Sequence, residues 1–113
     1  MKKILIAIAA AAMLSSSAAW GALKNALELF YYCASQDAKI RLECGGYIRG
    51  VYDTYEFMAE GLGGPKLICL PSDVSIEQLT KVVKATYTQN IDKYDMSAAA
   101  LVLGALGNEY PCK

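Results

Sequence analysis

The stretch CGGYIRGVYD (residues 44–53) lies inside the longest run of helical periodicity in the chain, and it contains three glycines and a cysteine. Apolar residues recur there every three or four positions, as they do on one face of an α-helix. They are Ile40, Cys44, Tyr47, Ile48, Val51, Tyr55, Met58 and Leu62. The pattern predicts a long helix over residues 38–60. The segment GLGGPK (residues 61–66) should end it, with Gly61 in the left-handed conformation and Pro65 preventing resumption.

The glycines raise a question, because each glycine inside a helix costs roughly 0.5–1 kcal/mol relative to alanine. Gly46 and Gly50 are four residues apart and therefore share one helix face. One interpretation is a close crossing with the first or the fourth helix, and the spacing favours it. The other is a bare surface on which the backbone of a partner docks.

The N-terminus has the layout of a secretory signal peptide. MKK is followed by an apolar run over residues 4–14 and then by small residues. That run is too short to span a bilayer, which needs about 20 residues. We expect a signal peptide over residues 1–19, with cleavage after Gly21 as the alternative, and a single domain over residues 20–113. An N-terminal core helix fits less well, because Lys2 and Lys3 precede an alanine-rich run.

The charge balance excludes several functional classes. The chain has 11 Lys+Arg, 11 Asp+Glu and no histidine. Removal of Lys2 and Lys3 with the signal peptide leaves 9 basic against 11 acidic residues, so we expect no nucleic-acid partner. No second apolar run reaches membrane-spanning length. The absence of histidine removes the commonest metal ligand and general base, and we expect neither metal nor cofactor.

Three further helices flank the long one. The first is predicted over residues 22–35, with Leu23, Leu27, Phe30 and Ala34 facing the core and Ala26 and Tyr31 beside them. The third begins at Ser75, which forms a capping box with Gln78. Its inner face is Ile76, Leu79, Val82, Val83 and Tyr87. The fourth is capped by Asp95 or Ser97, ends at Gly107 and Asn108, and buries Ala99, Leu101, Val102, Ala105 and Leu106. The fold class is therefore all-α, a small four-helix domain of two αα-hairpins.

We expect the four cysteines to form two disulfides, because an exported chain meets an oxidising compartment. There is no CxxC motif. Short connections make helices one and two, and helices three and four, antiparallel neighbours. Of the three possible pairings, this topology favours Cys33–Cys44 and Cys69–Cys112.

We find no catalytic set. The serines have no histidine partner, and Asp53 with Glu56 fits a solvated helix face better than a pair of catalytic carboxylates. Eight tyrosines are many for this length, and Tyr52 and Tyr94 fall outside the apolar stripes. Exposed tyrosine is enriched at protein interfaces, so these two hint at a protein-binding role.

Three blocks of sequence resemble the Tai-type immunity proteins, which protect bacteria from type VI secretion amidase effectors. The first is Cys44-Gly45-Gly46-Tyr47-Ile48-Arg49-Gly50 with Asp53. The second is Cys69-Leu70-Pro71 with Val74, Gln78-Leu79 and Val82-Val83. The third is Leu101-Val102, Ala105-Leu106 and Tyr110-Pro111-Cys112.

The resemblance implies a periplasmic homodimer that is not an enzyme and that occludes the active site of a peptidoglycan amidase. Candidate contacts are two loops, formed by Gly63, Gly64 and Lys66 and by Asn90, Ile91, Lys93 and Tyr94. The alternative is a periplasmic helical chaperone of the acid-stress type. A hydrolase that uses Asp53 and Glu56 is the least favoured interpretation.

Overall fold

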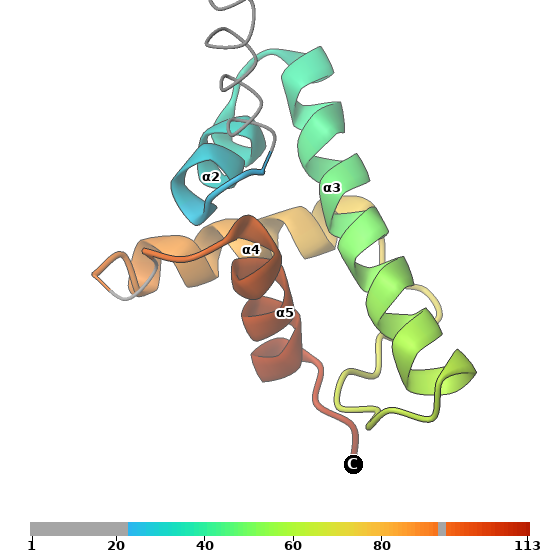
Figure 1. Cartoon of the computed structure of the whole chain (residues 1–113). Coiled ribbons are helices and arrows are strands. Elements are labelled where there is room, and N and C mark those ends of the chain that lie inside the picture. Colours follow the sequence, from blue (N-terminus) through green and yellow to red (C-terminus); the bar gives the residue numbers. More distant parts are fainter. Residues whose placement is uncertain (1–22, 93–94) are drawn as a thin grey trace, which may run out of the picture.

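A computed structural model describes residues 23–92 and 95–113, and this part of the chain is helical (Figure 1). Its elements are the α-helices α2 (Ala26–Ala34), α3 (Ala38–Glu56), α4 (Ile76–Gln89) and α5 (Ala98–Glu109), with a π-helical turn η2 (Phe57–Gly61) that continues α3. Only isolated β-bridges join extended segments within these ranges. The expected all-α, four-helix fold is confirmed. The expected signal peptide and its cleavage site lie outside the described residues.

Side-chain caps set the start of each α-helix. Asp37 accepts a hydrogen bond from the backbone amide of Lys39, and Ser75 forms the predicted capping box with Gln78. Of the two candidates for the last helix, Ser97 is the cap, because its hydroxyl accepts from the amide of Ala100 at 3.2 Å. The first helix begins four residues later than expected, at Ala26.

One core holds the helices together, and each of the four α-helices contacts the other three. In Figure 1, α4 crosses the α2–α3 hairpin, and α5 packs against α4 with its axis running across that of α4. The largest fully buried side chains of the core are Leu29, Ile48, Leu101, Leu106, Val83, Val102, Cys33 and Cys44. The inner face predicted for α4 supplies the buried residues of that helix. In α5 the predicted Leu101, Val102, Ala105 and Leu106 are buried, but Ala98 is buried in place of the predicted Ala99, which is half-buried. No helix in the described part of the chain is long and apolar enough to cross a membrane.

The predicted inner face of the first helix is wrong. Leu23 and Leu27 are 86% and 44% exposed, whereas Ala26, Leu29 and Cys33 are buried. The sequence of the first helix allows two overlapping apolar faces, and contacts with the rest of the fold select which of them is buried. Cys33 must face α3 to reach Cys44, and the amide of Ala26 donates to the carbonyl of Met96 at 2.9 Å, beside the start of α5.

Both predicted disulfides are present. Cys33–Cys44 closes the α2–α3 hairpin, and Cys69–Cys112 joins the segment before α4 to the residues after α5. The Cα atoms are 5.0 Å apart in each pair. Two backbone hydrogen bonds flank the second disulfide, from Cys69 to Tyr110 and from Cys112 to Leu67.

The close helix crossing predicted at Gly46 and Gly50 is also wrong. A Cβ atom added at either position would meet nothing within 4 Å. The close approach is made by the buried Gly45, where a Cβ would lie 3.1 Å from Cγ1 of Ile76 on α4. The partner is therefore the third helix of the chain, and Gly46 and Gly50 lie on the open face of α3.

The end of the long helix also differs from expectation. The backbone widens into a π-helical turn after Glu56, and Gly61 still belongs to this turn. The left-handed residue is Gly63, with φ of 73°. Met58 and Leu62, expected in the core, are 54% and 68% exposed.

Candidate partner-binding site

A groove of about 750 Å³ runs along the open face of α3 and down to the loop after η2. We call it the apolar groove. Three parts of the chain line it. The helix α3 supplies Gly46, Tyr47, Gly50, Val51, Thr54 and Tyr55. The η2 turn and the following loop supply Met58, Ala59, Leu62, Gly64, Pro65 and Leu67, and α5 supplies Ala99 and Leu103. None of these side chains is charged.

The groove exists because α3 is longer than the helix that covers it. At 1.5 Å per residue, the 19 residues of α3 span about 28 Å, whereas the nine residues of α2 span about 14 Å. The apolar stripe continues past the end of that cover. Its C-terminal half is packed on one side only, against α5 and the loop, and therefore remains open to solvent.

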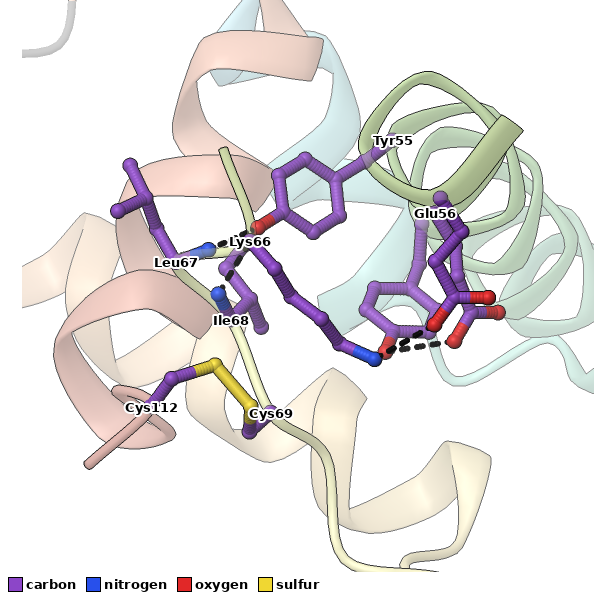
Figure 2. The surroundings of a disulfide bond; sticks show 9 residues. Tyr55, Glu56, Lys66, Leu67, Ile68, Cys69 and Cys112 are labelled. Carbon is purple, nitrogen blue, oxygen red and sulfur yellow. Dashed lines mark hydrogen bonds and ion pairs between the residues drawn. A yellow bond between two sulfur atoms is a disulfide. The ribbon is translucent and has the colours of Figure 1, made fainter. Parts of the chain in front are cut away.

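Tyr55 fixes the loop side of the apolar groove. Figure 2 shows its ring reaching from α3 to the chain before α4, where the hydroxyl accepts hydrogen bonds from the amides of Leu67 and Ile68. The disulfide between Cys69 and Cys112 ties the next residues to the end of α5. The groove therefore has a wall held from two sides.

The loop folds back on the π-helical turn. The amide of Gly64 donates to the carbonyl of Met58 at 3.1 Å, and a Cβ at Gly64 would lie 3.0 Å from that oxygen. Lys66 forms a salt bridge with Glu60 at 2.7 Å. Both side chains of this pair are exposed, so it adds little stability. Its hydrogen bond raises the pKa of Lys66.

Large apolar side chains surround the groove. Met58, Leu62 and Leu67 line it and are more than half exposed, and Phe57 next to them is 62% exposed. A contiguous exposed apolar patch of this kind marks a protein interaction site more often than isolated surface leucines do. The arrangement is suited to binding another macromolecule.

The titratable side chains of α3 beside the apolar groove make a structural contact or face solvent. Glu56 accepts a hydrogen bond from the hydroxyl of Tyr52 at 3.4 Å, and Asp53 is exposed. Burial, and next the charge of Glu56, raise the pKa of Tyr52. The described residues contain no group of three or more His, Cys, Asp or Glu side chains that could hold a metal ion.

The two loops expected to contact a partner are far apart. Figure 1 shows the loop of residues 62–67 beyond the end of α3 and the loop after α4 on the opposite side of the fold. Gly64 lines the apolar groove, whereas Gly63 is exposed and Lys66 points to Glu60.

In the second loop, Asn90 caps α4 through a hydrogen bond to the carbonyl of Thr86, and Ile91 is 60% exposed. Lys93 and Tyr94 lie outside the described residues. Tyr52, expected to be exposed, is half-buried against the core.

The sequence interpretation missed most of the apolar groove because Met58 and Leu62 continue the core stripe without a change in period. The available signal was length. An apolar stripe over more than 20 residues cannot be covered along its length by a neighbour predicted to have 14. The end of the stripe that the shorter helix does not reach must be exposed to solvent or covered by another part of the chain or by a partner.

A comparison with protein families decides the general role. Residues 22–112 match the family described as Rap1a immunity proteins. The chain belongs to the Rap1a immunity protein family. No curated protein and no solved structure gave a significant match. Membership of an immunity family indicates protection against a secreted effector rather than catalysis, which agrees with the general role implied by the resemblance to Tai-type proteins.

Proposed function

We propose that this protein is a periplasmic immunity protein that binds a type VI secretion effector, a peptidoglycan amidase, and sterically blocks its active site. The observation that carries the proposal is the family match over residues 22–112. The two disulfides support an oxidising compartment outside the cytoplasm. The amidase as target rests on the resemblance of the three sequence blocks to Tai-type proteins.

The apolar groove is the surface we assign to the effector. Its exposed Met58, Leu62 and Leu67 supply contact area that water otherwise covers, and burial of this area is the main driving force for association. Its wall is held by Tyr55 and by the Cys69–Cys112 disulfide, so little conformational freedom is lost on binding. A preformed apolar surface of this kind suits steric inhibition.

A homodimer is part of the proposal. The loops containing Gly64 and Ile91 lie on opposite sides of one protomer (Figure 1). One narrow cleft of an amidase is reached more easily by loops from two different protomers. Light scattering on a sizing column should give twice the monomer mass, and the free protein should elute as one species.

The test is inhibition of an amidase encoded next to the gene of this protein. The oxidised mature chain is titrated into the amidase, and cleavage of peptidoglycan cross-links is followed. We expect loss of activity at stoichiometric amounts and co-elution of the two proteins. Full activity with no complex would reject the proposal for that amidase.

The second loop is tested by Lys93→Glu and Tyr94→Ala. Each should weaken inhibition if this loop enters the cleft, whereas Lys113→Glu should not. Unchanged inhibition in both loop variants would remove Lys93 and Tyr94 from the contact surface.

The exposed apolar surface also suits the alternative role, a periplasmic chaperone that binds unfolded clients. An assay for aggregation of unrelated proteins at low pH separates the two. A chaperone suppresses aggregation of many clients, whereas an immunity protein inhibits one effector and leaves the aggregation unchanged.

A further inference from the structure

A second groove, of about 540 Å³, runs between α3 and α4 and differs from the first in charge. Arg41 and Arg49 line it from α3, and Lys81 and Lys84 line it from α4. We call it the basic groove. Its single lining carboxylate is Glu77. The whole chain has equal numbers of basic and acidic residues. The basic groove, with four cationic side chains and one carboxylate, is therefore a local concentration of positive charge.

No carboxylate of the described residues lies within 4.0 Å of the charged nitrogens of these four side chains. Among the described residues, the ion pair within 4.0 Å is that of Lys66 with Glu60, which belongs to the other groove. Arg41 donates a hydrogen bond to the carbonyl of Ser35 at 2.9 Å, which holds its guanidinium in place without neutralising it. The charge of the basic groove is therefore available to an anionic ligand.

The spacing of the cations indicates the length of that ligand. Arg41 and Arg49 are eight residues apart on one helix face, which separates their Cα atoms by about 12 Å. Lys81 and Lys84 are three residues apart on the facing helix and are neighbours there. Positive charge thus lines both walls over a length of about three to four residues of extended peptide.

The rest of the lining identifies the class of ligand. Leu42, which is 75% exposed, and Ile76 give the groove apolar contacts between its cations. A polyphosphate backbone would leave these apolar contacts unused. A protein segment that alternates acidic and apolar side chains matches both features, because complementary charge and apolar contact occur together in protein interfaces.

The two grooves share one lining residue on α3. Gly46 lines both of them, and its missing Cβ leaves open space at the point where they meet on α3. A partner that binds in the apolar groove can therefore extend across α3 into the basic groove without passing over a side chain at Gly46.

We propose that the basic groove receives an acidic segment of the effector, with at least two carboxylates that pair with Arg41 and Arg49 on one wall and with Lys81 and Lys84 on the other. This inference rests on the proposed function, since the ligand is a part of the effector. The groove acts as an electrostatic docking site, and the apolar groove supplies the burial that keeps the complex together.

The main test is the association rate constant with the amidase encoded beside the gene, measured at several salt concentrations. Lys81→Glu with Lys84→Glu should lower this constant at least about tenfold at low salt, because attraction becomes repulsion. The control is Lys39→Glu with Lys113→Glu, which changes the net charge equally and touches neither groove. Lys81→Gln with Lys84→Gln should fall between the wild type and the reversal. Circular dichroism and intact disulfides verify the fold of each variant.

A second measurement does not depend on the effector. A labelled peptide with alternating glutamate and leucine is titrated into the protein, beside the same peptide with glutamine for glutamate, a short single-stranded DNA, and vesicles of anionic lipid. The proposal expects the glutamate peptide to bind best and to lose its affinity in the Lys81→Glu, Lys84→Glu variant. Tighter binding of DNA or vesicles would overturn the assignment to an acidic protein segment.

The outcomes separate this inference from the proposed function. If all variants associate with the amidase as fast as the wild type does, the basic groove is not a docking site and the immunity function stands. If the wild type does not bind the amidase, the proposed function fails for that amidase, and the peptide titration alone decides on the groove.

Discussion

The hydroxyl of Tyr55 accepts a hydrogen bond from the amide of Ile68 at 2.9 Å, and this contact joins α3 to the chain that precedes α4. The same oxygen accepts from the amide of Leu67. One side chain thus satisfies two consecutive backbone donors and sets the distance between the two walls of the apolar groove.

Tyr55→Phe should lower the free energy of unfolding by about 1–3 kcal/mol, because the half-buried amide of Ile68 loses its acceptor. Urea unfolding measures the change, and hydrogen exchange at Leu67 and Ile68 should become faster. Tyr31→Phe is the matched control, since Tyr31 is 65% exposed and should give a change near zero. Equal stability of the two variants would contradict the structural role of the Tyr55 hydroxyl.

Gly46→Ala and Gly50→Ala should each raise the free energy of unfolding by about 0.5–1 kcal/mol, because alanine favours the helix and its Cβ meets nothing. Gly45→Ala should gain less than either, since its Cβ would lie 3.1 Å from Ile76. Chemical denaturation of the three variants gives the order. A Gly45→Ala variant as stable as Gly46→Ala would refute the close packing of α3 on α4.

A larger residue at Gly46 should separate stability from function. Gly46→Gln should leave the fold intact and weaken amidase binding, since its side chain would stand where the two grooves meet. Lys39→Gln, on α3 but outside both grooves, is the control. Retained affinity in Gly46→Gln would show that the partner does not cross α3 at this point.

Leu62→Asp and Leu67→Asp should each weaken binding of the amidase by at least about tenfold, because a charge is placed in the apolar contact. The two leucines are 68% and 65% exposed, so the free energy of unfolding should change little. Calorimetry measures the affinity. Leu23→Asp is the control, since Leu23 is 86% exposed and lies outside the groove. A comparable loss in the control would show that apolar surface in general, rather than this groove, binds the partner.

Tyr52 should make stability fall in alkaline solution. Burial and then Glu56 raise its pKa above the ordinary value of 10.0, so the unfolded chain releases this proton first as the pH rises. The raised pKa of Tyr52 adds to the free energy of unfolding, and this addition is fully present below pH 10.0, the ordinary pKa of tyrosine. It is lost as the pH rises through the higher pKa that Tyr52 has in the folded protein. Denaturant midpoints on both sides of pH 10 measure the decline, which should be shallower in Tyr52→Phe. An equal fall of the denaturant midpoint with pH in the wild type and in Tyr52→Phe would contradict this role of Tyr52.

Removal of the Cys69–Cys112 disulfide should cost about 4 kcal/mol, since it closes a loop with a sequence separation of 43 residues. The double alanine variant should also inhibit less, because the same bond holds the groove wall at Leu67. Denaturation and inhibition are measured together. Full inhibition at unchanged affinity would show that the groove wall keeps its position without the disulfide.

Much of this protein could be read from local patterns. Periodicity predicted the existence of α3, α4 and α5, and the capping box at Ser75 placed the start of α4. The pairing of the cysteines followed from hairpin topology. These features depend on residues close in sequence or on the ends of adjacent helices, so the chain encodes them locally.

The face of α2, the contacts of the glycines and both grooves were decided by tertiary structure. Leu23 and Leu27 match helical spacing as well as Ala26 and Leu29 do. The disulfide of Cys33 with Cys44 and the hydrogen bond of Ala26 with Met96 select the face that is buried. Gly46 and Gly50 are open because no side chain or backbone approaches within 4 Å of the position that a Cβ would take. The basic groove joins residues about 40 positions apart, and no local period connects Arg41 with Lys81. Sequence determined which segments are helices, whereas the packing of helices of unequal length decided which surfaces remain free to bind.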